Sequence, residues 1–150
     1  MHCKHKLKID LIPESSWCKN LRNHIGQTKW NKIGIESCER VKGFCEICGA
    51  TETRRLDCHE IFEYDEETKI QKLTGFMSLC RKCHQVIHFE NTRLRATEGN
   101  FELEPFIEHF MKVNNCDRKT FDEHRTKALD IWRKRNKVEW SVDLGGFDAL

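Results

Sequence analysis

Long apolar segments, internal repeats and low-complexity linkers are all missing from this sequence. No stretch approaches the roughly 20 consecutive apolar residues that a membrane-spanning helix requires, so we expect a soluble protein without a membrane partner. The segment from Met1 to Lys8 alternates polar and basic side chains and lacks the apolar core of a secretory signal. We therefore expect a cytoplasmic, reducing location, in which disulfide bonds are uncommon.

An excess of charge of one sign is missing as well, because 26 Lys and Arg residues face 24 Asp and Glu residues and leave a net charge of +2. The positive excess lies in residues 1–44, which carry nine Lys and Arg against four Asp and Glu. A nucleic-acid footprint requires this segment, or a second basic run at Arg133, Lys134, Arg135 and Lys137, to lie beside the functional site. For the second run, a solvated helix face is at least as good an interpretation.

Cysteine, in contrast, is abundant, with nine residues in the chain. Four of them form two Cys-x-x-Cys pairs, Cys45 with Cys48 and Cys80 with Cys83, on either side of residues 49–79. Each pair can turn two thiolates toward one point, and two such pairs complete the tetrahedral sulfur shell that structural zinc prefers. Packing as small apolar side chains or pairing in disulfides is the alternative, and the spacing together with a reducing location favours zinc.

The segment between the two pairs has the alternation of a β-hairpin. Residues 54–64 alternate as a strand does, which places Cys58 and His59 on opposite faces. Residues 69–74 form the expected returning strand, which Gly75 is expected to end.

From Arg81 onward the pattern becomes helical. His84 and His88 are then one turn apart on the same face, where two imidazoles can converge on one metal ion, although such pairs also occur by chance. Arg81 and Lys82 stand at the start of this helix, where they can meet phosphate because helix N-termini attract anions. Ordinary surface charge is the alternative interpretation of these two residues.

Helices are expected on both sides of this central segment. Thr28 can cap a helix that leads to the first cysteine pair, and Glu104 with Pro105 opens another helix after it. Thr120 and Glu123 have the spacing of a capping box for a final helix. We expect the two C-terminal helices either to wrap the central segment and complete its core or to present a surface to a protein partner.

The sequences CEIC at residues 45–48, DCHEI at residues 57–61 and LCRKCH at residues 79–84 together resemble the HNH endonuclease family. The resemblance covers residues 45–88. The flanking sequences WCKNLR and HFMKVN to EWSVDLGGF are similar to a bacterial and phage group of HNH-like proteins. The resemblance implies an α+β fold, built on a zinc-braced ββα-metal module of treble-clef-like form with flanking N- and C-terminal helices.

A length of 150 residues fits a single compact domain, or a compact zinc module with helical flanks. The chain then consists of a lead-in and helix at residues 1–44, the zinc-binding module at residues 45–89 and a helical extension at residues 90–150 that packs on the module. With 38% hydrophobic and 33% charged residues the core is modest, so bound zinc would supply folding free energy that apolar burial alone does not provide.

The activity implied by the resemblance is metal-dependent hydrolysis of phosphodiester bonds in DNA. His59 stands where the family has its general base, and His84 stands where the family has a metal ligand that His88 can join. The cation would be Mg²⁺, Mn²⁺ or Zn²⁺. Arg81 and Lys82 would contact the nucleic acid.

Two positions depart from the family pattern. Cys58 occupies the position of a ligand that is usually Asp or His, and Gly75 occupies the position of the Asn in the family name. One interpretation keeps the chemistry, with Cys58, His84 and His88 forming a second metal site and His59 acting on water. The other is a catalytically degenerate HNH-fold protein, of a kind that a phage could encode, that binds or inhibits a nucleic-acid or protein partner. The oligomeric state has no signal in the sequence.

Overall fold

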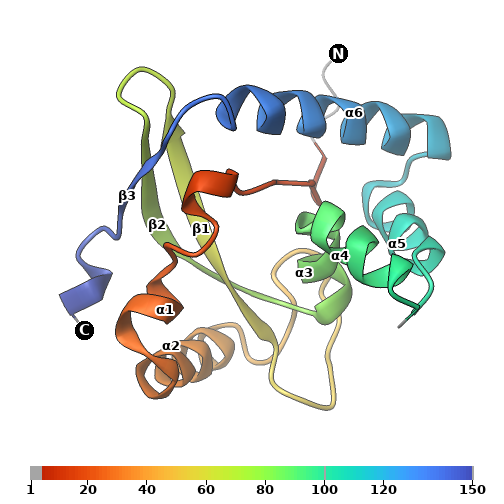
Figure 1. Cartoon of the computed structure of the whole chain (residues 1–150). Coiled ribbons are helices and arrows are strands. Elements are labelled where there is room, and N and C mark those ends of the chain that lie inside the picture. Colours follow the sequence, from red (N-terminus) through yellow and green to blue (C-terminus); the bar gives the residue numbers. More distant parts are fainter. Residues whose placement is uncertain (1–4, 100, 150) are drawn as a thin grey trace.

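The computed structural model describes residues 5–99 and 101–149, which form a mixed α+β fold of six α-helices and a three-stranded sheet (Figure 1). Among these residues no helix combines the length and apolar character needed to cross a membrane. The elements are α1 (Leu21–Ile25), α2 (Gln27–Arg40), β1 (Asp57–Asp65), β2 (Ile70–Leu79), α3 (Arg81–Ile87), α4 (Phe89–Thr97), α5 (Glu104–Asn114), α6 (Arg118–Arg135) and β3 (Ser141–Asp143), with short 3-10 turns at Glu14–Ser16 and Phe147–Ala149.

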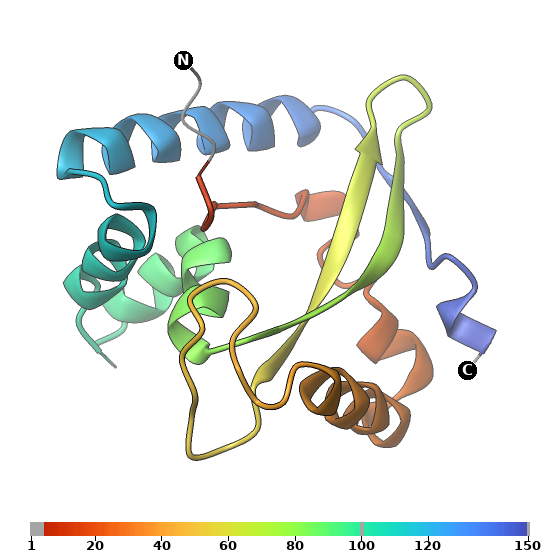
Figure 2. The same ribbon diagram turned by 180° about the vertical axis from the view of Figure 1, so that it is seen from behind.

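The long antiparallel hairpin β1–β2 separates two groups of helices. Figure 2 shows α1 and α2 on one side of the hairpin and α3 to α6 on the other. The expected hairpin is therefore present, and the expected helix after it begins immediately at the end of β2. The helix expected to be capped by Thr28 is α2, which begins at Gln27, directly after α1. Its N-cap residue is Gly26, two positions before Thr28.

Gly75 does not end the returning strand, contrary to the sequence expectation. Ile61 pairs with Gly75 and Phe62 pairs with Leu73, so Thr74 is an extra residue in a β-bulge. The bulge leaves Thr74 unpaired but does not end the pairing with β1, so β2 continues to the second cysteine pair. The hairpin is consequently long enough to bring the start of β1 beside α3.

A small apolar cluster joins α1 and α2 to the sheet. Leu21, Ile33 and Leu73 form its buried centre, and Cys58 and Phe62 pack against it from β1. Successive side chains of a strand point to opposite faces. His59, which follows Cys58 directly, therefore faces away from this cluster. The strand pattern thus directs the thiol and the imidazole of neighbouring residues to different surroundings.

The larger core lies among α3, α4, α5 and α6. Phe89, Phe110 and Phe121 meet edge to face, with ring centroids 5.2 Å apart for Phe89 and Phe121 and 5.1 Å apart for Phe110 and Phe121. The extended N-terminal segment threads between α6 and this group, where Leu7 and Ile9 are buried (Figure 1). Of the two C-terminal helices, α5 packs against α3, and α6 packs against α5.

The last long helix begins earlier than the capping-box pattern indicates. Asp117 is its N-cap residue, and its side chain accepts a hydrogen bond of 2.9 Å from the backbone N–H of Thr120. Thr120 therefore lies within the first turn and is not the cap. Asp and Thr are both favourable N-cap residues, so the sequence alone did not discriminate between the two positions.

The C-terminal segment returns along the sheet, where β3 pairs in parallel with β2. Beyond β3 the backbone of Gly145 has φ +63°, and a Cβ atom there would lie 2.5 Å from the carbonyl oxygen of Leu73. This close approach lets Phe147 reach Phe76, with ring centroids 5.0 Å apart. A glycine is therefore required at this point of the chain.

We expect Gly145→Ala to destabilise the protein by about 1–3 kcal/mol more than Gly146→Ala. Gly146 also has a positive φ, of +84°, but a Cβ there meets nothing within 4 Å. The two variants share the left-handed backbone penalty, so their difference isolates the clash with Leu73. Urea denaturation measures it, and equal losses of unfolding free energy would contradict the packing described here.

Candidate functional site

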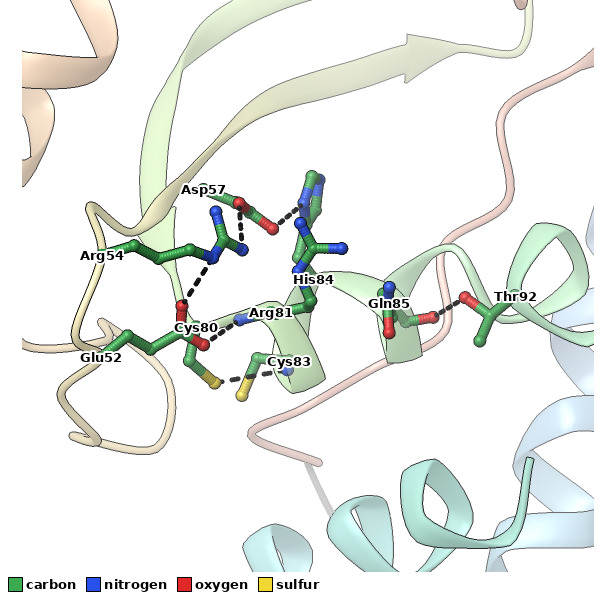
Figure 3. Close-up of polar contacts among 9 residues, drawn as sticks. All are labelled: Glu52, Arg54, Asp57, Cys80, Arg81, Cys83, His84, Gln85 and Thr92. Carbon is green, nitrogen blue, oxygen red and sulfur yellow. Dashed lines mark hydrogen bonds and ion pairs between the residues drawn. The ribbon is translucent and has the colours of Figure 1, made fainter. Parts of the chain in front are cut away.

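The two Cys-x-x-Cys pairs converge, as their spacing predicts. The Sγ atoms of Cys45, Cys48, Cys80 and Cys83 all lie within 4.8 Å of one another, and we call this group the four-cysteine centre. The first pair lies in a tight turn that a hydrogen bond of 2.8 Å from Cys45 N–H to the carbonyl oxygen of Ala50 closes. The second pair lies at the N-terminus of α3, where the Cys80 sulfur accepts a hydrogen bond from the backbone N–H of Cys83 (Figure 3).

The sulfur positions fit a tetrahedral metal shell. Metal–sulfur bonds of ~2.3 Å require sulfurs roughly 3.8 Å apart, and the Sγ atoms of Cys48 and Cys80 are 3.6 Å apart. Nε2 of His109 on α5 lies 3.1 Å from the Cys83 sulfur, where a ring N–H can stabilise thiolate charge. The four-cysteine centre could therefore hold a structural metal ion.

The ionisation of these thiols supports the same interpretation. Hydrogen bonds from Cys80 and then Cys83 lower the pKa of Cys45, whereas the neighbouring Cys45 and Cys80 raise the pKa of Cys83. Without a cation, ionisation of Cys45 thus disfavours ionisation of Cys83. A bound cation removes this conflict, because it stabilises all four thiolates together.

A second cluster combines three histidines. His59 comes from β1, His84 from α3 and His88 from the junction of α3 and α4, and their ring nitrogens lie within 4.8 Å of one another. The ring centroids are 5.3 Å apart for His59 with His84, 5.3 Å for His59 with His88 and 5.0 Å for His84 with His88. We call this group the three-histidine centre.

The electrostatics of the three-histidine centre suit a cation. Burial lowers the pKa of His59 to about 3 and the pKa of His88 to about 4, with further lowering by the neighbouring imidazoles. Both rings are therefore neutral at neutral pH, which is the form that coordinates metal ions. Nδ1 of His88 is buried and has no hydrogen-bond partner among the described residues. A buried unpaired nitrogen is costly, and a metal ion or water at the centre would satisfy it.

A chain of ion pairs and hydrogen bonds orients one of these histidines (Figure 3). Asp57 Oδ2 lies 3.1 Å from His84 Nδ1, and Arg54 holds the other oxygen at 3.0 Å. Arg54 Nε is 3.6 Å from Glu52 Oε2, and Glu52 Oε1 accepts a 2.7 Å hydrogen bond from the backbone N–H of Arg81. The chain connects the start of α3 to the three-histidine centre.

Asp57 was not singled out from the sequence. Burial raises the pKa of its carboxyl group, but the hydrogen bond from His84 and the contact with Arg54 outweigh this and leave the pKa below its usual value. A carboxylate on one imidazole nitrogen fixes the tautomer and leaves the other nitrogen free for a ligand. The available signal was that Asp57 and His59 alternate onto the same face of one strand.

Cys58 is not brought together with His84 and His88. It packs against the cluster of Leu21 and Ile33 on the opposite face of β1, and burial raises its pKa to about 11. A protonated thiol is a poor metal ligand. In the structure His59 occupies the place beside the helix histidines that was expected for Cys58, because strand alternation separates these neighbours.

The three-histidine centre opens into a cleft of about 910 Å³. Five exposed arginines line this cleft, and we call it the arginine cleft: Arg22, Arg54, Arg55, Arg81 and Arg95. Arg55 is fixed at its edge, because its Nη1 donates a 3.0 Å hydrogen bond to the carbonyl oxygen of Asn31. Asp57 and Glu60 are the acidic residues among the described lining, so positive charge dominates and favours an anionic ligand.

The basic residues expected to contact nucleic acid do not all lie at the arginine cleft. Arg81 lines the arginine cleft, whereas Lys82 is exposed and is not part of its lining. The basic N-terminal segment contributes Arg22 to the cleft. In the second basic run, Arg135 instead pairs with Glu66 at 2.9 Å, so it anchors the hairpin to α6.

Comparisons with known proteins returned no match to a protein-family model, to a curated protein or to a solved structure.

We expect Cys48→Ala and Cys83→Ala to remove the metal of the four-cysteine centre and to cost more than about 4 kcal/mol of unfolding free energy. Cys18→Ala is the matched control, since this thiol is exposed and lies outside the centre. The control should change stability by less than about 0.5 kcal/mol. Native mass spectrometry and thermal melting make the comparison, and a folded wild-type protein without metal would contradict the assignment.

Asp57→Asn keeps the size of the side chain but removes the charge that orients His84. We expect it to weaken binding of a metal ion at the three-histidine centre by about 10- to 100-fold and to leave the four-cysteine centre loaded. Calorimetric titration of Zn²⁺ into protein that already carries one ion measures the effect. Asp130→Asn, at an exposed carboxylate paired with Arg133, is the control. Equal affinities for the two variants would show that Asp57 does not orient a ligand.

Proposed function

We propose that this protein is a metal-dependent endonuclease of HNH type that hydrolyses phosphodiester bonds in DNA. The observation that carries the proposal is the three-histidine centre inside the arginine cleft. Imidazoles converging on one point suit a catalytic cation, and surrounding arginines suit the phosphates on either side of a scissile bond. A cleft with the opposite charge would not support this substrate.

The arrangement of the chain around the centre supports a ββα-metal module. The hairpin β1–β2 leads directly into α3, the hairpin supplies His59, and the helix supplies His84 with His88 at its end. This is the order of elements that the resemblance implied.

Zinc is the metal that we propose for the four-cysteine centre. Four thiolates form a soft, tetrahedral donor set, which selects zinc over the harder magnesium and calcium ions. The centre joins the turn after α2 to the start of α3, so its role in the proposal is to hold the module together.

In the proposed reaction His84 and His88 would hold a second divalent cation, with Asp57 fixing the ring of His84. Such a cation would stabilise the developing phosphate charge and the leaving oxygen. His59, on the facing strand, would accept a proton from the attacking water. Among Mg²⁺, Mn²⁺ and Zn²⁺, the nitrogen donor set favours Zn²⁺.

The even spacing of the three rings also suits His59 as a third ligand. The two roles have different consequences for metal content. A base can be removed without loss of the second ion, whereas removal of a ligand weakens its binding.

A second candidate function is binding of DNA, or of a protein partner, without cleavage. It is favoured by Gly75, which offers no side chain at the position of the family Asn, and by Cys58, which faces away from the histidines. The C-terminal helices would supply the protein-binding surface in this case, and Ile131 on α6 is 49% exposed. The arginine cleft would then bind DNA without cleaving it.

We expect the wild-type protein to nick supercoiled plasmid DNA in a titration of Mg²⁺, Mn²⁺ or Zn²⁺, and His59→Ala to lower the rate by at least about 100-fold. His24→Ala is the control, because this exposed histidine lies outside the cleft lining. Metal analysis of His59→Ala separates the base from the ligand role. Absence of cleavage of both plasmid and single-stranded DNA with every metal would overturn the nuclease and leave the binding function.

A further inference from the structure

An apolar pocket continues the arginine cleft on the side of His88. It has a volume of about 250 Å³, and it shares Ile12, Trp17, His88 and Asn91 with the cleft lining. A bound strand can therefore reach the pocket and the three-histidine centre at the same time. We call it the tryptophan pocket, because Trp17 and Trp132 both line it.

The walls of the tryptophan pocket are aromatic and fixed. Trp132 Nε1 donates a 2.9 Å hydrogen bond to the carbonyl oxygen of Ile12, which sets the orientation of its ring. Trp17 meets His88 edge to face, with ring centroids 6.1 Å apart and an interplanar angle of 88°. Trp17 is nevertheless 44% exposed, so part of its surface is available to a ligand. Leu94, 53% exposed, stands at the same pocket.

The charge of the pocket differs from that of the cleft beside it. The described residues lining the pocket include no Lys or Arg, whereas five arginines line the cleft. Two glutamates belong to the lining: Glu90 is paired with Arg93 at 2.8 Å and with Arg125 at 2.7 Å, and Glu14 is exposed. Phosphates are thus directed to the cleft, and the pocket suits an uncharged ring.

A nucleobase combines the required properties. Its flat face stacks on tryptophan whatever the base, and Asn91 offers both a donor and an acceptor for a polar edge. At about 250 Å³ the pocket is below the roughly 300–1,000 Å³ of pockets for drug-sized ligands, which is consistent with a single ring system. A paired base in a duplex keeps its faces stacked on its neighbours and cannot enter such a pocket without leaving the helix.

We propose that the tryptophan pocket takes one unpaired nucleobase of a DNA strand whose phosphate lies at the three-histidine centre. The preferred substrate is then single-stranded or locally unpaired DNA. This inference rests on the proposed function, because it uses the arginine cleft as the path of the strand. It adds the structural class of DNA that the site selects.

Binding of 2-aminopurine oligonucleotides tests the proposal. Full-length protein in the His59→Ala background, in which the strand stays intact, is titrated with a single strand, a perfect duplex, and a duplex with one unpaired 2-aminopurine. We expect the two unpaired forms to bind at least about tenfold more tightly than the perfect duplex and to show quenching of the fluorescent base by stacking.

Trp17→Ala in the same background should weaken binding of the single strand by about tenfold and abolish the quenching. Phe44→Ala is the matched control, since Phe44 is aromatic and 53% exposed but lines neither cavity. Leu94→Glu places a negative charge at the pocket without touching the core, and it should give a similar loss. If thermal melting shows that Trp17→Ala is misfolded, the affinity of Leu94→Glu for the single strand tests the pocket instead.

Two results would overturn the pocket assignment: unchanged affinity for the single strand in the folded Trp17 and Leu94 variants, or a preference of the parent for perfect duplex. Neither result depends on hydrolysis. A protein that cleaves neither plasmid nor single-stranded DNA, yet binds unpaired bases through Trp17, would lose the proposed activity and retain the pocket. A protein that cleaves single-stranded DNA as fast after Trp17→Ala would retain the activity and lose the pocket.

Discussion

Cys80 has two roles at once, and the candidate site depends on both. Its thiol belongs to the four-cysteine centre, and the same residue is the N-cap of α3. The backbone N–H of His84 donates to the carbonyl oxygen of Cys80 at 3.0 Å, and that of His88 donates to His84 at 3.2 Å. The helix that carries both imidazoles is thus set, turn by turn, from the point where the sulfurs converge. A helix this short is not stable by itself, so its position depends on that tertiary anchor.

Polar contacts fix the position of the hairpin relative to α3. Glu52 and Arg54 connect the backbone of Arg81 to Asp57, which in turn contacts His84. One network therefore joins the turn region, the first residue of β1 and the helix. Because each member is charged or hydrogen-bonded to a charged partner, displacement of one leaves others unpaired in a half-buried site. Such a network fixes the relative positions of its side chains more than it adds to the free energy of unfolding.

Local sequence patterns predicted the features that depend on residues close together in the chain. These features are the convergence of the two cysteine pairs, the hairpin, and the pairing of His84 in α3 with His88 at its C-cap. The choice between Cys58 and His59 was not predicted, because it depends on which face of β1 meets α3 and which meets α2. The bulge at Thr74 was missed for a related reason: glycine usually weakens a strand, and only the partner strand shows that the ladder continues.

The residues farthest apart in sequence were the hardest to assign. Trp17 and Trp132 come from opposite ends of the chain and meet at one pocket, and no periodicity connects them. The five arginines of the cleft are likewise drawn from the N-terminal segment, the turn before β1, and helices α3 and α4. Their grouping is visible only in three dimensions, since net charge near zero conceals a local excess of one sign.

The three-histidine centre departs from the usual packing of a protein interior, in which buried polar groups are hydrogen-bonded. The imidazoles of His59, His84 and His88 are packed together, with His88 Nδ1 buried and without a hydrogen-bond partner among the described residues, although apolar side chains of similar size would pack there without this cost. Local sequence choices that reduce stability without a compensating contact are typical of functional sites. The four-cysteine centre at the other end of the same short helix offsets that cost, because a metal there would hold α3 in place whether or not the histidines are satisfied. Separating the stabilising site from the reactive one in this way lets the second remain open to a substrate.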